Sequence, residues 1–184
     1  MNALEKAIFA AVPKAAKKYG QMTGWWLSHA PESFIQIYVS CLLADEGYSV
    51  YPDISVGRIR EELELDSKNI ADDILRYKCD ISVWFKKKRA LRASIEIKKS
   101  WNSSSILKDI EKIRRINSVS RSASQGYILG YSESKTRTGD SSLAGKFQNW
   151  ADYSGCKLLD HKIIHDPPID EVYSAWGFCL IRVT

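Results

Sequence analysis

Two acids and a lysine stand in a pair of apolar runs that a basic cluster separates. Asp80 lies in the first run, residues 77–85. Glu96 lies in the second run, residues 90–99, and Lys98 follows it on the same run. Apolar, β-branched runs of this length are typical of strands, and a short turn between them predicts a hairpin. Because side chains alternate along a strand, Glu96 and Lys98 share one face of this hairpin.

The position of the turn decides whether the two acids meet. A turn centred on Lys88 pairs residue 84 with residue 92 and Asp80 with Glu96, at a Cα–Cα distance of about 4.5–5.5 Å. A slip of one residue would send the two carboxylates to opposite faces. In the predicted register, two carboxylates and one ammonium group converge at one point.

Such a cluster suits a divalent cation. Facing carboxylates repel each other, and a cation between them offsets that cost. Mg²⁺ prefers oxygen ligands and is commonly held by one or two carboxylates together with a substrate phosphate. The ion activates a bound water, and a neighbouring lysine stabilises charge on the phosphate. A structural interpretation stands beside this one, in which Asp80 pairs with Lys98 and Glu96 is a surface residue.

Charge is unevenly distributed along the 184 residues, whose formal net charge is +5. Residues 45–80 contain ten acids and five bases, whereas residues 86–121 contain twelve bases and three acids. The basic half suits a polyanion such as nucleic acid, although a solvated lysine face has the same composition. The candidate phosphate contacts are Lys87, Lys88, Lys99, Lys108, Lys112, Arg115, Lys135 and Arg137.

Further elements are predicted on both sides of the hairpin. An amphipathic helix that contains Pro13 is expected over residues 2–19, and a second helix begins near Glu32 and ends before Gly47. The second helix is expected to bury Phe34, Ile37, Tyr38, Cys41, Leu42 and Ala44. A strand over residues 48–56 carries Pro52, which indicates a bulge or a sheet edge. After the hairpin, residues 106–117 predict a helix with one buried and one basic face.

Three more strands are expected at residues 126–131, 157–165 and 176–183, with a helix over residues 140–153. No linker or repeat is visible, which favours a single domain over residues 1–184, with its core at about 31–131 and residues 1–20 as an added helix. The four cysteines form no CxxC pair and are interpreted as buried apolar residues, and Trp25 and Trp26 as core or interface anchors. No run has the length or pattern of a membrane span or a signal peptide, so a cytoplasmic protein without a membrane partner is expected.

Cys79-Asp80 followed by Glu96-Ile97-Lys98 resembles the motif of the PD-(D/E)XK nuclease superfamily, with Cys79 in the place of the proline. The predicted order of helix, three strands, helix and strand is similar to the core of that superfamily over about residues 31–131. The resemblance implies an α/β fold with a restriction endonuclease-like αβββαβ core. In such a core a mixed central sheet is flanked by helices, and this chain would add an N-terminal helix and C-terminal strands.

The resemblance also implies a function. Asp80, Glu96 and the Ile97 carbonyl would hold Mg²⁺, with Mn²⁺ as a substitute, and Lys98 would orient or activate the attacking water. Glu32 is either a helix-start acid or a further ligand, because several branches of the superfamily use an acid on the first core helix. The expected activity is an endonuclease acting on double-stranded DNA, in a homodimer or a larger defence or repair complex. The alternative is a catalytically silent protein of this fold that binds nucleic acid or a protein partner, as an assembly factor or inhibitor.

Overall fold

The computed structural model describes residues 1–25, 27–62, 75–85, 90–99, 103–120, 124–134, 139–165 and 175–184. Within these residues, six strands form one mixed sheet in the order β1-β2-β3-β4-β6-β5. Strands β3 and β4 are parallel, and all other neighbours are antiparallel. The strands are β1 (Ser49–Ser55), β2 (Lys78–Phe85), β3 (Ala90–Lys98), β4 (Gln125–Ser134), β5 (Lys157–His165) and β6 (Ala175–Val183).

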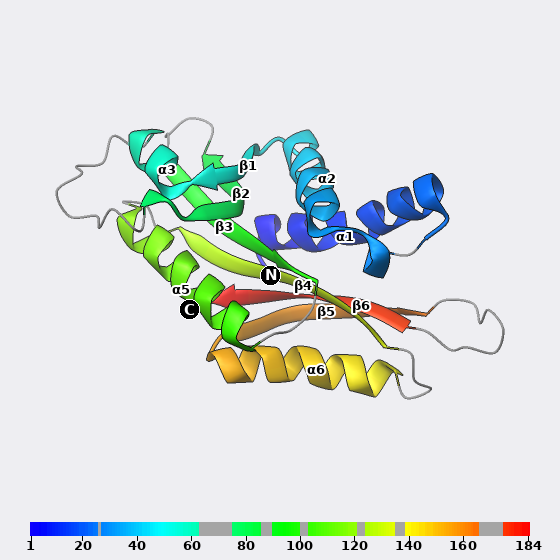
Figure 1. Ribbon diagram of the computed structural model, residues 1–184. Coiled ribbons are helices and arrows are strands. Elements are labelled where there is room, and N and C mark those ends of the chain that lie inside the picture. Colours follow the sequence, from blue (N-terminus) through cyan, green and yellow to red (C-terminus); the bar gives the residue numbers. More distant parts are fainter. Residues whose placement is uncertain are drawn as a thin grey trace.

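Helices cover both faces of this sheet, which makes the fold a mixed α/β fold (Figure 1). The helices α1 and α2 lie on one face, and α5 and α6 lie on the other. A short helix, α3, stands between β1 and β2 in sequence. The helices are α1 (Ala3–Thr23), α2 (Glu32–Asp45), α3 (Val56–Glu62), α5 (Ser103–Val119) and α6 (Gly139–Ser154), with a 3-10 turn, η1 (Leu27–His29).

The hydrophobic core is divided between the two faces by the alternation of side chains along β3. Ala93, Ile95 and Ile97 belong to the cluster under α1 and α2. The intervening Ser94, Glu96 and Lys98 lie on the face that α5 covers, where Ser94 and Lys98 bond to side chains of α5. Burying one Ile or Leu side chain stabilises the fold by about 1.5–3 kcal/mol, so the apolar face fixes which face the polar residues take.

Helix α1 belongs to the same core as the sheet. Leu4 and Ile8 are fully buried in the cluster that also contains β3 and β4 side chains. Asn2 and Glu5 form a reciprocal capping box at the start of α1, and Gly24 ends the helix in a left-handed conformation at φ 73°. Of the two roles expected for Trp25, core or interface anchor, its exposure of 59% contradicts the first, and Trp26 lies outside the described residues.

The predicted buried face of α2 is confirmed only in part, since Phe34 and Leu42 are partly buried and pack against the core. Ile37, Cys41 and Ala44 are exposed. Apolar residues stand on every side of this helix, so their periodicity does not define one face. The residues that α2 buries are Ile35, Val39, Ser40 and Leu43.

The cysteines form no disulfide: all four are free thiols. Cys79 and Cys179 are buried, as expected, whereas Cys156 is partly exposed and Cys41 is exposed. Among the described residues, no helix combines the length and the apolar character that a membrane span needs.

Candidate active site

The register of the hairpin sets Asp80 beside Glu96. Ile81 of β2 pairs with Ile95 of β3, which is the predicted register. The Asp80 amide nitrogen lies 3.4 Å from Glu96 Oε1 and donates to it. Asp80 Oδ2 accepts a hydrogen bond of 2.7 Å from the amide of Ile97. The two carboxylates therefore meet where β2 begins and β3 approaches its end.

Closer to the turn, the predicted register is wrong. A bulge between Val83 and Trp84 makes Trp84 pair with Leu91, whereas a turn centred on Lys88 predicts residue 92. A bulge adds one residue to one strand, so an error at the turn does not reach the acids on the far side of the bulge. Residues 86–89, with the candidates Lys87 and Lys88, lie outside the described residues.

Helix α5 supplies two further charged groups to the site. Lys112 Nζ lies 2.6 Å from Glu96 Oε2 and 3.5 Å from Asp109 Oδ1. Lys98 Nζ lies 3.0 Å from Asp109 Oδ2, so the ion pair of Lys98 is with Asp109 and not with Asp80 as the structural interpretation expected. Glu96 is 1% exposed and is not a surface residue. Glu96, Lys112, Asp109 and Lys98 thus form a continuous charged network between β3 and α5.

The sequence predicts Lys112 as a phosphate contact on the surface, but its side chain points into the charged network. Its side chain is 19% exposed and is turned towards Glu96 and Asp109. Asp109 is a residue of this network that the sequence motif does not indicate. The available signal was the spacing of Asp109 and Lys112, because residues three apart on a helix lie on the same side of it.

Glu32 reaches the same end of β3 from the start of α2. Its Oε1 accepts a hydrogen bond of 2.7 Å from the backbone amide of Lys99. The charge of Glu32 also contributes to the raised pKa values of both Asp80 and Lys98, which indicates that the three groups are neighbours. Glu32 is therefore both the first residue of α2 and part of the acidic cluster.

Burial raises the pKa values of both acids, and the charge of a neighbouring acid adds to it: Asp80 for Glu96, and Glu32 for Asp80. Burial, and then the charge of Asp80, raise the pKa of Glu96 to about 8, although Lys112 counteracts them. Burial also raises the pKa of Asp80, against the hydrogen bond from Ile97 and the charge of Lys112. Burial lowers the pKa of Lys112, but the charges of Glu96 and Asp109 outweigh it, so that pKa is raised. Burial therefore favours the protonated form of both acids, and the charge of Lys112 counteracts it.

The donor set suits a small divalent ion that keeps part of its water. Four carboxylates, of Glu32, Asp80, Glu96 and Asp109, stand against the ammonium groups of Lys98 and Lys112. With all four carboxylates ionised, which a bound cation would favour at Glu96, two negative charges are left for one divalent cation to neutralise. No three His, Cys, Asp or Glu side chains of the described ranges come close enough to enclose a metal by themselves. Mg²⁺ needs no such enclosure, because waters and substrate oxygens complete its shell.

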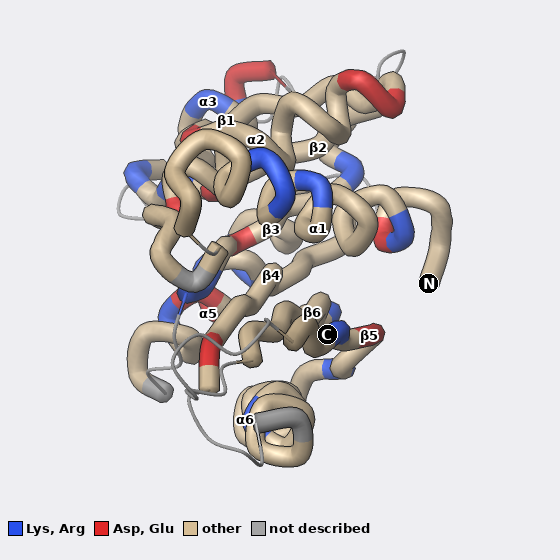
Figure 2. The backbone as a smooth tube through the Cα atoms, turned by 90° about the vertical axis from the view of Figure 1, so that its right-hand side faces the viewer, with Lys and Arg blue, Asp and Glu red and all other residues tan. Residues whose placement is uncertain are grey.

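The remaining basic candidates differ in how exposed their side chains are. Lys99 and Lys108 are exposed. Arg115 is half-exposed and pairs with Glu111 at 2.8 Å. Figure 2 shows acidic and basic positions close together on α5. Lys135 and Arg137 lie outside the residues that the structure describes.

Comparisons of the chain with models of known families, with curated proteins and with solved structures found no match.

Proposed function

We propose that the protein is a metal-dependent nuclease with a restriction endonuclease-like core, and that it hydrolyses phosphodiester bonds in DNA. The observation that carries the proposal is the contact of Asp80 with Glu96 on adjacent strands, with Lys98 two residues further along. The order α2, β1, α3, β2, β3, α5, β4 supports it as well, since apart from the short helix α3 it is the succession of elements that the resemblance implies. Buried acids with raised pKa values are typical of functional sites.

Asp80, Glu96 and the carbonyl of Ile97 are the groups that would hold Mg²⁺ or Mn²⁺. When bound, such an ion lowers the pKa of a coordinated water and polarises the phosphoryl group. The amide of Ile97 donates to Asp80 at 2.7 Å and so fixes the orientation of that carboxylate. Glu32, which bonds the Lys99 amide, would add negative charge at the outer side of the site.

Lys98 would orient the attacking water or stabilise the charge on the phosphate. Its Nζ lies 3.0 Å from Asp109 Oδ2, and this contact holds the ammonium group at the edge of the acidic cluster. Asp109 is thus a positioning residue for Lys98. The exposed Lys99 and Lys108 would bind phosphates further along the substrate, where each such contact adds salt-dependent affinity.

Plasmid cleavage in the presence of Mg²⁺ tests this proposal. We expect Asp80→Ala and Lys98→Ala each to lower the cleavage rate at least about 100-fold, which is what a positioned acid–base group typically contributes. Asp152→Ala, which removes an exposed acid on α6, is the matched control and should cleave like the wild type. Equal cleavage by the wild type and both site variants would sink the assignment.

One observation favours a second candidate, a catalytically silent protein of the same fold that binds nucleic acid. The ammonium group of Lys112 lies 2.6 Å from Glu96 Oε2 and so pairs with an oxygen that a metal ion would need as a ligand. In this case Lys112 takes the place of a metal permanently. DNA binding that needs no Mg²⁺, weakens steeply with salt and leads to no cleavage would favour this candidate. Calorimetric titration with Mn²⁺ would separate the two, because only a nuclease site should bind the ion.

A further inference from the structure

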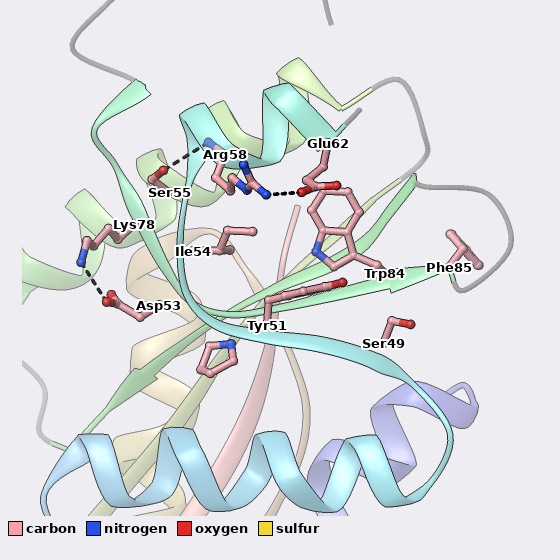
Figure 3. A pocket seen from close by; sticks show the side chains of 11 residues that line it. Ser49, Tyr51, Asp53, Ile54, Ser55, Arg58, Glu62, Lys78, Trp84 and Phe85 are labelled. Carbon is pink, nitrogen blue, oxygen red and sulfur yellow. Dashed lines mark hydrogen bonds and ion pairs between the residues drawn. The ribbon is translucent and has the colours of Figure 1, made fainter. Parts of the chain in front are cut away.

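A pocket of about 480 Å³ opens at the edge of the sheet, between β1, the end of β2 and α3 (Figure 3). Its volume is within the range of about 300–1,000 Å³ that is usual for small-molecule sites. None of the residues proposed for catalysis lines it. The pocket is therefore separate from the residues proposed for catalysis and has the size of a small-molecule site.

Aromatic side chains form one wall of the pocket. Tyr51 is 54% exposed, and its ring stands edge-on to that of Trp84 at a centroid distance of 6.1 Å and an angle of 78°. Trp84 is only 6% exposed, and its Nε1 donates a hydrogen bond of 2.8 Å to Ser82 Oγ. Phe85, at 38% exposure, extends this wall. The wall thus combines a fixed indole with an accessible phenol ring.

Polar groups stand around the aromatic wall. Arg58 pairs with Glu62 at 2.8 Å on α3, and Lys78 pairs with Asp53 at 2.8 Å across β1 and β2. All four side chains are at least 46% exposed, so a ligand can reach their remaining donor and acceptor positions. Figure 3 shows the two pairs on different sides of Ile54. Arg58 also pairs with Glu61, at 3.2 Å. Exposed pairs of this kind contribute little to stability, so a ligand that replaces one of them costs the fold little.

The pocket lies on the same face of the sheet as the acids. Ser82, which holds Trp84, pairs with Ser94, and Ser94 Oγ donates to Asn117 on α5. Lys78 lines the pocket and precedes Asp80 by two residues, which is about 6.6 Å along a strand. A polynucleotide with one phosphate at Asp80 would therefore reach the pocket within a short distance.

We infer that this pocket binds one unpaired nucleobase of the substrate, next to the phosphate at which cleavage occurs. A nucleobase is flat, stacks on aromatic rings, and carries donors and acceptors on its edge that charged and hydroxyl side chains bond. Tyr51 is the stacking partner, and Arg58 and Lys78 bond the base edge. The inference rests on the proposed function for its choice of nucleic acid as the ligand.

Binding of mononucleotides to the full-length protein in EDTA tests the pocket without any cleavage. The reporter is the indole Nε1–H signal of Trp84 in a nitrogen–proton NMR spectrum, assigned with Trp84→Phe. We expect nucleoside monophosphates to shift this signal and ribose 5-phosphate to leave it unchanged. Tyr51→Ala should weaken the binding about tenfold, the lower part of the range for losing one stacked base, and Tyr51→Phe should keep it. Tyr153→Ala removes a tyrosine of similar exposure, 60%, on α6 and is the matched control.

Three outcomes would overturn the inference. They are equal shifts by ribose 5-phosphate, equal or tighter binding of N-acetyl-tyrosinamide, which would indicate a peptide site, and unchanged affinity in Tyr51→Ala. The nuclease assignment is judged separately by plasmid cleavage. A protein that cleaves DNA while Tyr51→Ala binds nucleotides normally keeps the proposed function and loses the pocket. A protein that binds bases through Tyr51 without cleaving keeps the pocket and loses the nuclease.

Discussion

Lys112 is the residue on which the two candidate functions differ. Its ammonium group contacts both Glu96 and Asp109, two acids that come from different elements. An internal cation of this kind lets a site with several buried carboxylates fold before any metal arrives, because an unpaired buried charge is costly. In a nuclease, Lys112 must share Glu96 with the metal. In a catalytically silent protein, Lys112 pairs with Glu96 and no metal ion binds to that carboxylate.

The variant Lys112→Gln shows which of these descriptions holds. Without metal, we expect it to lose about 2 kcal/mol of unfolding free energy at pH 7. Breaking a buried pair usually costs about 3–5 kcal/mol, and here the cost is smaller because Glu96, with a pKa of about 8, is largely protonated at pH 7. Urea unfolding measures the change, first without Mg²⁺ and then at Mg²⁺ concentrations that rise in steps of about tenfold. Because the freed Glu96 binds an ion better, added Mg²⁺ should stabilise Lys112→Gln more than the wild type.

Lys108→Gln serves as the control, since Lys108 is an exposed lysine on the same helix. It should unfold like the wild type and gain no additional stability from Mg²⁺. A Lys112→Gln protein that Mg²⁺ stabilises no more than the wild type would argue against a metal at Glu96 and for the silent protein.

The raised pKa of Glu96 predicts how stability depends on pH. Its pKa is 4.5 for a free side chain and about 8 in the folded protein. Between these values the folded state binds more protons than the unfolded state, so the free energy of unfolding falls as the pH rises. In EDTA we therefore expect stability to decline from about pH 4.5 to about pH 8 by a few kcal/mol. Urea unfolding across this window should show a flatter profile for Glu96→Gln, and an equally steep profile in that variant would contradict the assignment to Glu96.

At the scale of elements, the site depends on how closely α5 packs on the sheet. Gly126 of β4 makes this approach possible, because a Cβ atom there would lie 2.0 Å from Ile113 Cγ2. Gly126→Ala should therefore push α5 outward and cost about 1–3 kcal/mol, the usual cost of overpacking. Since α5 carries Asp109 and Lys112, cleavage should fall as well. Gly145→Ala on α6 meets no atom within 4 Å and should be neutral or slightly stabilising in the same thermal unfolding and cleavage assays.

Alternating patterns made the hairpin predictable, and a uniform pattern made α2 unpredictable. On β3, apolar and polar residues alternate, so the sequence assigns Glu96 and Lys98 to one face. On α2, apolar residues occupy every side: Ile37 and Cys41 of the predicted stripe are exposed, whereas Val39, which is not part of it, is buried. A period identifies a face only where the opposite face is polar.

The charged network of α5 lies beyond what the sequence can specify. The pattern of buried isoleucines correctly gives the inner side of this helix, from Ile106 to Ile116. It does not give the position of the helix along β3, which depends on close contacts such as that at Gly126. From the sequence alone, Lys112 is therefore expected to be an exposed lysine. In the structure its side chain contacts Glu96 and Asp109 instead.

At the scale of the whole molecule, α1 is tied to the middle of the sheet by a buried acid. Glu5 is fully buried, Tyr127 of β4 donates a hydrogen bond of 2.9 Å to its Oε1, and Arg182 of β6 forms an ion pair with the same oxygen. These contacts join residues at opposite ends of the chain. The first helix therefore completes the core that supports β3 and β4, and with them the acids at the end of β3.

Glu5→Ala should accordingly destabilise the entire protein. Removing one partner of a buried ion pair costs about 3–5 kcal/mol, and the capping box of α1 is lost with it. Glu5→Gln keeps an acceptor for Tyr127 and should cost less, whereas Glu46→Ala removes an exposed acid after α2 and should cost almost nothing. Calorimetric unfolding should show one cooperative transition at a lower temperature for Glu5→Ala. If α1 instead melts separately while the sheet unfolds as in the wild type, then α1 is an addition to the fold, and the site on β3 does not depend on it.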